Sequence, residues 1–294
     1  MKIVQSFWSK PGKKGDGFNN FGWPDRKFNF FAWTLSLLQF RKYYPEVELV
    51  TDKEGYNLLV EKLELPYTST RVCLDELNDY HPELFALGKI YAYRLQEHPF
   101  IHVDNDVFIW EKFSDQLVSA ALIGQNLEDG DLYNRFYRMI FFELVDKIGY
   151  YPDVLNDSLD RNHRILAVNA GILGGTSMDF FKLYTREAFE FVDKVSSKIN
   201  RINVKDFNTI FEQVLFHALA EKKNLKIGYY RKEPIRYRFD IADFTLVPSR
   251  TKYIHLIGAF KKNRAVLQQL EYRLMTDYPD NYYKILDLIR KNHI

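Results

Sequence analysis

The stretch FIHVDNDVFIW, residues 100–110, has the apolar composition of a buried strand but carries two carboxylates, Asp104 and Asp106, in its middle. Taking an unpaired carboxylate out of water costs several kcal/mol, so a strand holds two of them only where something offsets their charge. Where a strand leaves a sheet, Asp-x-Asp can direct both carboxylates at one divalent cation, Mg²⁺ or Mn²⁺. The alternative is a turn in which these short side chains bond the local backbone.

Strand-like and helix-like segments alternate along the chain around this stretch. Apolar runs predict strands at 3–8, 47–52, 66–72, 99–103 and 121–126, with shorter candidates at 225–230 and 244–249. Helical spacing predicts helices at 25–43, 55–64, 83–97, 178–196 and 206–223, then two final helices at 264–277 and 280–292 split by Pro279. The alternation predicts an α/β fold with a mostly parallel central sheet and helices on its faces. Ligands of such sheets bind at the carboxyl ends of the strands, where Asp52, Asp104 and Asp106 are expected.

Composition limits the classes of function. The chain has 294 residues, 46% of them hydrophobic, which is enough for one large domain or two small ones. Its 41 basic and 39 acidic residues give a net charge of +2, so no surface for nucleic acid is expected. A single cysteine, Cys73, fits a reducing compartment, and no apolar run is long enough for a membrane span. We therefore expect a cytoplasmic protein.

Two later motifs join the Asp pair as candidates for a site. In AVNAGILGG, residues 167–175, the glycines permit close backbone approach, and Asn169 can both donate and accept hydrogen bonds. The alternative for this motif is a buried strand followed by a glycine turn. In HLIGAFK, residues 255–261, an imidazole, a glycine and a lysine stand at fixed spacing. His255 and Lys261 could supply a third metal ligand and a charge that binds phosphate.

Taken together, these motifs resemble those of GT-A fold glycosyltransferases, nearest to the retaining family 8 enzymes, which include glycogenin and bacterial lipooligosaccharide galactosyltransferases. The family has a basic residue on a helix, then D-x-D, N-A-G, an acidic residue followed by Gln, and H-x-x-G-x-x-K. The same order appears here over roughly residues 3–262, as Lys89, Asp104-Asn105-Asp106, Asn169-Ala170-Gly171, Glu212-Gln213 and His255/Gly258/Lys261.

The resemblance implies a Rossmann-like GT-A catalytic domain at 1–262, with a C-terminal helical extension at 263–294 packed on it. It implies a hexosyltransferase that uses Mn²⁺ or Mg²⁺ and a nucleotide diphosphate sugar, with a UDP-sugar favoured. The acceptor would be a glycan or a lipid-linked molecule, and the anomeric configuration would be retained. The implied metal ligands are Asp104, Asp106 and His255. The implied donor-binding residues are Val4, Ser6, Asp52, Lys89, Asp104, Gly258 and Lys261. The implied catalytic residues are Lys261, which neutralises the leaving group, and Asn169, Glu212 and Gln213 on the side of the sugar.

Some positions depart from the family pattern. Lys262 and Asn263 stand where Pro-Trp is usual, Glu212 stands where Asp is common, and residues 127–164 match no family motif, so we expect acceptor recognition there. Two other functions stay open. A sugar-nucleotide nucleotidyltransferase is disfavoured because no G-x-G-T-R-like signature follows the first strand, and a non-catalytic nucleotide-sugar-binding relative need not keep the metal ligands. A homodimer and peripheral contact with a membrane are both compatible with the sequence.

Overall fold

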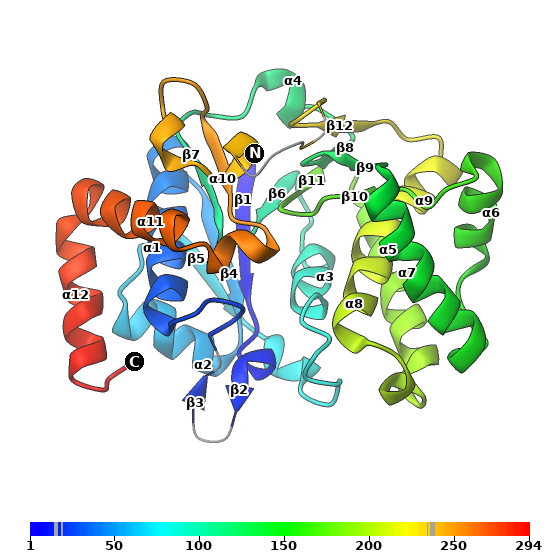
Figure 1. The fold of residues 1–294 in the computed structure, drawn as a ribbon, viewed down its shortest axis with the longest axis horizontal. Helices are drawn as coiled ribbons and strands as arrows, with labels where there is room; N and C mark the ends of the chain where they lie inside the picture. Colours follow the sequence, from blue (N-terminus) through cyan, green and yellow to red (C-terminus); the bar gives the residue numbers. More distant parts are fainter. Residues whose placement is uncertain (15–16, 19, 234, 236–238) are drawn as a thin grey trace. The chain divides into compact units, whose positions relative to one another are not determined.

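The computed structural model describes residues 1–14, 17–18, 20–233, 235 and 239–294. The chain forms two compact units. Unit 1 comprises residues 1–75, 103–112 and 235–294, and unit 2 comprises residues 76–102 and 113–234. The predicted α/β class is confirmed, because each unit combines strands with helices (Figure 1). Within the described part of the chain, no helix has the length and apolar character needed to cross a bilayer.

Parallel strands form the centre of unit 1. Strand β1 (Lys2–Phe7) pairs with β4 (Val47–Thr51), which in turn pairs with β5 (Ser69–Val72), all in parallel. Every residue of β4 is buried, as expected for a strand covered on both faces. Helix α1 (Arg26–Tyr43) connects β1 to β4, and the Asp25 carboxylate caps its first turn by accepting a hydrogen bond from Lys27 N. The strands and the helix predicted for this part of the chain are therefore present.

The C-terminal residues complete unit 1. Strand β7 (Val107–Ile109) pairs antiparallel with β13 (Tyr253–His255). Helices α11 (Arg264–Asp277) and α12 (Pro279–Arg290) pack on each other and on α1, as the orange, red and blue helices of Figure 1 show. The Phe31 and Tyr282 rings lie 5.2 Å apart in this contact. The two final helices are thus confirmed, while the domain boundary at residue 262 stays a prediction.

Unit 2 carries the other strands of the α/β fold, in the order β12-β8-β11-β6. They are β12 (Ile227–Tyr229), β8 (Leu122–Gly124), β11 (Ile172–Gly175) and β6 (Phe100–Val103), the last of which leads into unit 1 after His102. Strand β12 is parallel to β8, and β11 is antiparallel to it. Gly174 allows close approach here, because a Cβ at this position would lie 2.1 Å from the carbonyl oxygen of Phe100.

Aromatic side chains fill the core between the helices of unit 2. Helix α3 (Leu87–Arg94) packs on α7 (Met178–Ser196), which also contacts α9 (Leu215–Lys222). The ring centroids of Phe100 and Phe181 lie 4.7 Å apart, and those of Tyr184 and Phe216 lie 5.2 Å apart. Between α8 (Val204–Thr209) and α9, the chain forms a π-helical turn, η6 (Ile210–Val214). This rigid core holds the polar side chains of α3 and η6 in place.

One segment differs from its predicted structure, and a second segment had no predicted structure. The strand candidate at 244–249 is instead a 3₁₀ turn (Phe244–Leu246), because the Asp243 carboxylate accepts hydrogen bonds from Thr245 N and Oγ1 and so favours a turn. The unmatched stretch 127–164 contains β9 (Leu127–Glu128), α5 (Asp131–Glu143), the π-helical turn η4 (Leu144–Ile148) and α6 (Asp153–Asn162). Strand β9 pairs antiparallel with β10 (Ala167–Val168), next to the Asn-Ala-Gly motif.

Candidate functional site

The two aspartates of the opening stretch lie in the tight turn between β6 and β7. A backbone hydrogen bond of 3.1 Å from Val107 N to Asp104 O closes this turn. The Asn105 side chain donates to Asn29 Oδ1 of helix α1 at 3.2 Å. Asp104 is half-buried, whereas Asp106 is only 3% exposed. The turn therefore interrupts an apolar strand pair and presents one carboxylate nearer to the surface and one in the interior.

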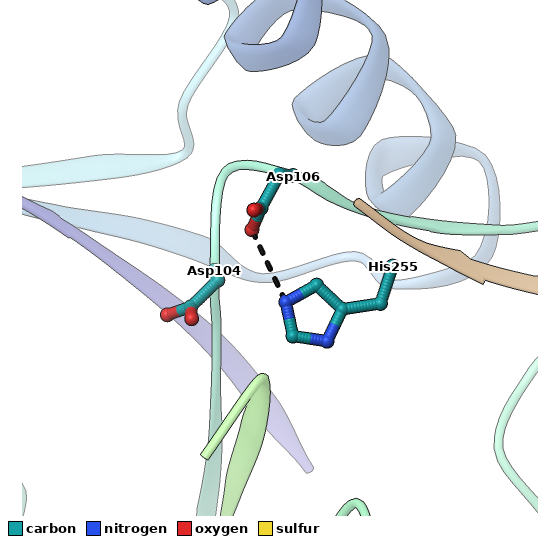
Figure 2. Close-up of side chains that lie close together, drawn as sticks. All are labelled: Asp104, Asp106 and His255. Carbon is teal, nitrogen blue, oxygen red and sulfur yellow. Dashed lines mark ion pairs between the residues drawn. The ribbon is translucent and has the colours of Figure 1, made fainter. Parts of the chain in front are cut away.

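The antiparallel pairing of β7 with β13 brings His255 to this turn. His255 stands opposite Val107, and Leu256 N donates to Asp106 O at 3.0 Å. The imidazole Nε2 consequently lies 3.4 Å from Asp106 Oδ1. Figure 2 shows the ring directed at the Asp106 carboxylate, with Asp104 beside them. One ligand atom from each of Asp104, Asp106 and His255 lies within 4.8 Å of the others, so the three could hold a metal ion.

Lys261 supplies a positive charge on the other oxygen of Asp106. Its Nζ lies 2.8 Å from Asp106 Oδ2 and 5.4 Å from the centroid of the Trp23 ring, which is itself buried. Burial by itself would raise the pKa of Asp106, but the charges of Lys261 and His255 hold that pKa well below its usual range. Lys261 thus offsets the charge of the buried carboxylate of the opening stretch.

The chemistry of the cluster fits a small divalent cation. Two carboxylates and one imidazole are a ligand set that Mg²⁺ or Mn²⁺ accepts. Ligands on opposite sides of such an ion are at most about 4.2 Å apart, so atoms that lie within 4.8 Å of one another need only small side-chain rotations to share it. His255 and Lys261 contact different oxygens of Asp106, so Lys261 can keep its ion pair while the cluster accepts a cation.

Gly258 sets the direction of the segment between His255 and Lys261. Its φ of +51° lies in the left-handed region, and a Cβ at this position would meet no atom within 4 Å. A side chain at this position would therefore destabilise the protein through backbone strain and not through a steric clash. We expect Gly258→Ala to lower the free energy of unfolding by about 1–2 kcal/mol, and Gly258→Asn to lower it by less, because asparagine tolerates this conformation better. Urea unfolding of the three proteins measures both differences, and equal losses for alanine and asparagine would contradict the conformational explanation.

A second group of predicted residues forms a buried ion pair in unit 2. Lys89 of α3 reaches Glu212 of η6, with Nζ and Oε1 2.5 Å apart, and it also donates to Ala170 O at 3.2 Å. The side chains of Lys89 and Glu212 are 15% and 4% exposed. Three motifs that are far apart in the sequence, the helical lysine, Asn-Ala-Gly and Glu-Gln, therefore meet at one point.

Hydrogen bonds continue from this pair through the Asn-Ala-Gly motif. Asn169 donates to Glu128 Oε1 at 2.8 Å and accepts from Gly171 N at 3.1 Å. Tyr137 of α5 bonds the other oxygen of Glu128 and lies 3.4 Å from Gln213 Oε1. Burial, reinforced by the charge of Glu128, raises the pKa of the Tyr137 hydroxyl well above its usual range, which favours the protonated hydroxyl that donates to Glu128.

Glu128 and Tyr137 are members of this network that the sequence did not identify. Both are nearly fully buried, at 4% and 1% exposure. One signal was available for Glu128, because the predicted strand at 121–126 ends in two polar residues, Gln125 and Asn126, and Glu128 follows it closely. For Tyr137, no local pattern distinguishes it from the other aromatic residues of its helix.

The predicted nucleoside-binding residues lie on β1 and at the end of β4. Val4 is fully buried, and Ser6 is half-buried. Asp52 caps helix α2 (Lys53–Tyr56) by accepting from Gly55 N at 2.8 Å, and its other oxygen accepts from Ser9 N and Ser9 Oγ at 2.7 and 2.5 Å. Burial raises the pKa of Asp52 despite these hydrogen bonds. The structure thus assigns Asp52 a capping role, and its contact with a nucleoside stays a prediction.

One family model matches this chain. A family model described as a family of unknown function, DUF6734, matches residues 1–288. The chain belongs to DUF6734. No curated protein matches this DUF6734 chain in sequence. Among solved structures, it is similar to an active-site mutant of LgtC, at 10% identity and a TM-score of 0.38, over 72% of this chain and 70% of that one. A TM-score this low does not show a shared fold, so the GT-A assignment of the DUF6734 chain stays a prediction.

The predicted site residues of the DUF6734 chain therefore form two groups. In unit 1, the structure brings together Asp104, Asp106, His255 and Lys261. In unit 2, it connects Lys89, Asn169, Glu212 and Gln213 through the ion pair and hydrogen bonds described above. In each group, ion pairs and hydrogen bonds hold the charged or polar side chains in place, as recognition of a polar ligand requires.

Proposed function

We propose that this protein is a metal-dependent glycosyltransferase. It would transfer a hexose from a nucleotide diphosphate sugar, with a UDP-sugar favoured, to a glycan or lipid-linked acceptor, with retention of configuration. The observation that carries the proposal is the cluster of unit 1. There, the buried Asp106 contacts an imidazole on one oxygen and an ammonium on the other, and a second carboxylate, Asp104, lies within reach of the same ion.

This cluster suits a nucleoside diphosphate as the leaving group. A divalent cation held by Asp104, Asp106 and His255 would supply positive charge to the diphosphate as the bond to the sugar breaks. Lys261 adds a second positive charge beside the same site, where it can stabilise the phosphate oxygens. The buried Trp23 ring lies 5.4 Å from Lys261 Nζ, so part of the surroundings of this charge is apolar, which strengthens its interaction with a phosphate.

We assign the polar network of unit 2 to the sugar. Hydroxyl groups of a hexose need donors and acceptors that are already oriented, because rigid partners lose little entropy on binding. Asn169 is held by Glu128 and Gly171, and Gln213 lies beside the Tyr137 hydroxyl. The resemblance to family 8 enzymes supports the further assignment of Gln213 to the anomeric centre and of retention to the reaction.

The test is nucleotide binding and turnover with the whole chain. We expect UDP to raise the melting temperature in the presence of Mn²⁺ and to have little effect after EDTA treatment. With a panel of UDP- and GDP-sugars, at least one donor should release its nucleoside diphosphate slowly by hydrolysis. The absence of both signals across the panel would contradict the proposal.

The same assays separate the two other functions. A nucleotidyltransferase would form a nucleotide sugar and pyrophosphate from a sugar 1-phosphate and UTP, and it would release no UDP from a UDP-sugar. A non-catalytic relative would show the Mn²⁺-dependent thermal shift without turnover, even with a broad panel of glycan acceptors. Each result points to one function, so the three are distinguishable.

A further inference from the structure

Helix α5 of unit 2 exposes an apolar face that nothing described in the chain covers. Its inner side packs into the core through Tyr137, Ile140 and Phe141, and Leu144 of η4 continues this buried side. Its outer side presents Leu132, Met139 and Phe142, which are 80%, 62% and 70% exposed, and Val145 of η4 follows at 53%. Large apolar side chains that gather on one exposed face indicate an interaction surface.

Two arginines lie within this apolar face. Leu132, Arg135, Met139 and Phe142 follow one another at spacings of three, four and three residues, which places them on one stripe of the helix. Arg138 is exposed beside the stripe and donates to His163 O at 3.0 Å. We call Leu132, Arg135, Arg138, Met139, Phe142 and Val145 the α5 face. A helix that combines exposed apolar and basic side chains in this way is typical of a membrane interface.

The charges near the α5 face favour an anionic partner. Asp131 is paired with Arg164 at 2.5 Å, and Glu143 is paired with Lys147 at 2.6 Å. Among the described residues, by contrast, neither Arg135 nor Arg138 has a carboxylate within ion-pair distance. Asp131 and Glu143 thus already have cationic partners, and the exposed Asp146 adds one negative charge against the two positive charges of Arg135 and Arg138, so the α5 face keeps a net positive charge.

An open hollow lies on the same face. It has a volume of about 650 Å³ and is lined by Asp131, Asn134, Arg135, Arg138, Met139 and Phe142. Guanidinium groups bind phosphate oxygens through two parallel hydrogen bonds, so Arg135 and Arg138 are suited to phosphate groups at the rim of an apolar layer.

We propose that the α5 face docks this protein on a bilayer that contains anionic phospholipids. Leu132, Met139, Phe142 and Val145 would enter the boundary between headgroups and acyl chains, while Arg135 and Arg138 pair with lipid phosphates. A second copy of the chain fits this face less well, because a twofold contact would bring the arginines of both copies together. Docking of this kind does not depend on sugar transfer, so it can be tested without an activity assay.

The experiment is co-sedimentation of the full chain with large vesicles. We expect binding to vesicles of equal parts phosphatidylcholine and phosphatidylglycerol, much weaker binding to phosphatidylcholine alone, and a loss of binding between about 0.1 and about 0.5 M salt. Arg135→Glu with Arg138→Glu should weaken binding at least about 25-fold, since each basic residue near an anionic surface contributes about fivefold. Met139→Ser with Phe142→Ser should weaken it about 10-fold or more, because two apolar side chains no longer enter the bilayer.

Matched controls change the same chemistry elsewhere. Lys182→Glu with Arg186→Glu makes the same charge change on exposed residues of α7, and Tyr272→Ser with Tyr283→Ser removes two exposed aromatic rings from α11 and α12. We expect both to keep vesicle binding within about threefold, and circular dichroism should show that all variants are folded. Equal losses in the α5 and control variants, or no binding to anionic vesicles, would overturn the proposal. So would a dimer in sedimentation velocity that dissociates on Met139→Ser with Phe142→Ser while vesicle binding is unchanged.

Discussion

Replacing Asp106 with asparagine is expected to weaken Mn²⁺-dependent binding of UDP at least about 100-fold and to abolish donor hydrolysis. Asparagine keeps the volume of the side chain but removes the charge that a divalent cation requires. The substitution also leaves Lys261 beside a neutral amide where it had a carboxylate 2.8 Å away. Isothermal titration of UDP with and without Mn²⁺ measures the loss, and a thermal melt shows whether the variant is folded.

The control for Asp106 is Asp79→Asn, which removes a carboxylate from an exposed turn and should leave binding unchanged. A second variant separates the metal site from a purely structural ion pair. Asp106→Asn combined with Lys261→Met removes both charges, so it should recover much of any stability lost in Asp106→Asn but none of the metal-dependent binding. If Asp106→Asn alone retained Mn²⁺-dependent binding of UDP, the assignment of Asp106 as a ligand would be wrong.

Lys89→Met is expected to cause the largest loss of stability, about 3–5 kcal/mol. The substitution keeps an unbranched side chain of similar length but removes the positive charge beside Glu212, whose side chain is only 4% exposed. A buried ion pair contributes little net stability, but removing its cation is strongly destabilising, because the lost hydration of the carboxylate is no longer offset. Urea unfolding monitored by circular dichroism gives the difference in the free energy of unfolding.

A double substitution tests the cause of this loss. Lys89→Met with Glu212→Gln also removes the buried negative charge, so it should recover more than half of the stability that Lys89→Met alone loses. The matched control is the exposed pair of Lys205 and Glu83 in the same unit, at 3.2 Å, where Lys205→Met should cost less than about 1 kcal/mol. An equally large loss at Lys205, or no recovery in the double variant, would show that lost packing and not the buried charge is responsible.

Much of the local structure and of the first site could be predicted from the sequence. The apolar run of residues 100–110 and the helical spacing of residues 25–43 reflect burial, and burial acts on each segment in the same way wherever it packs. The paired aspartates could also be identified as needing a positive partner, because the desolvation of a carboxylate depends on its burial alone. His255 and Lys261 were candidates by residue type, and the resemblance to a family motif supported joining them to the aspartates.

The identity of the contacts depended on the tertiary structure. The register of β7 against β13 places His255 opposite Val107, and a shift of one residue would turn its side chain to the other face. The same holds in unit 2, where strand pairing and helix packing bring Glu128 and Tyr137 to the Asn-Ala-Gly motif. No local pattern encodes such pairings, because they arise between segments far apart in the chain.

Composition and periodicity thus predict an α/β chain with carboxylates at the ends of buried strands and a need for cations to offset them. The capping role of Asp52, the pairing of Lys89 with Glu212 and the exposure of the outer side of α5 became visible in the folded chain alone. Burial and charge follow from composition along each segment, whereas hydrogen bonds and ion pairs act over about 3 Å. Partners at that distance are chosen by strand register and helix packing, which involve the whole chain.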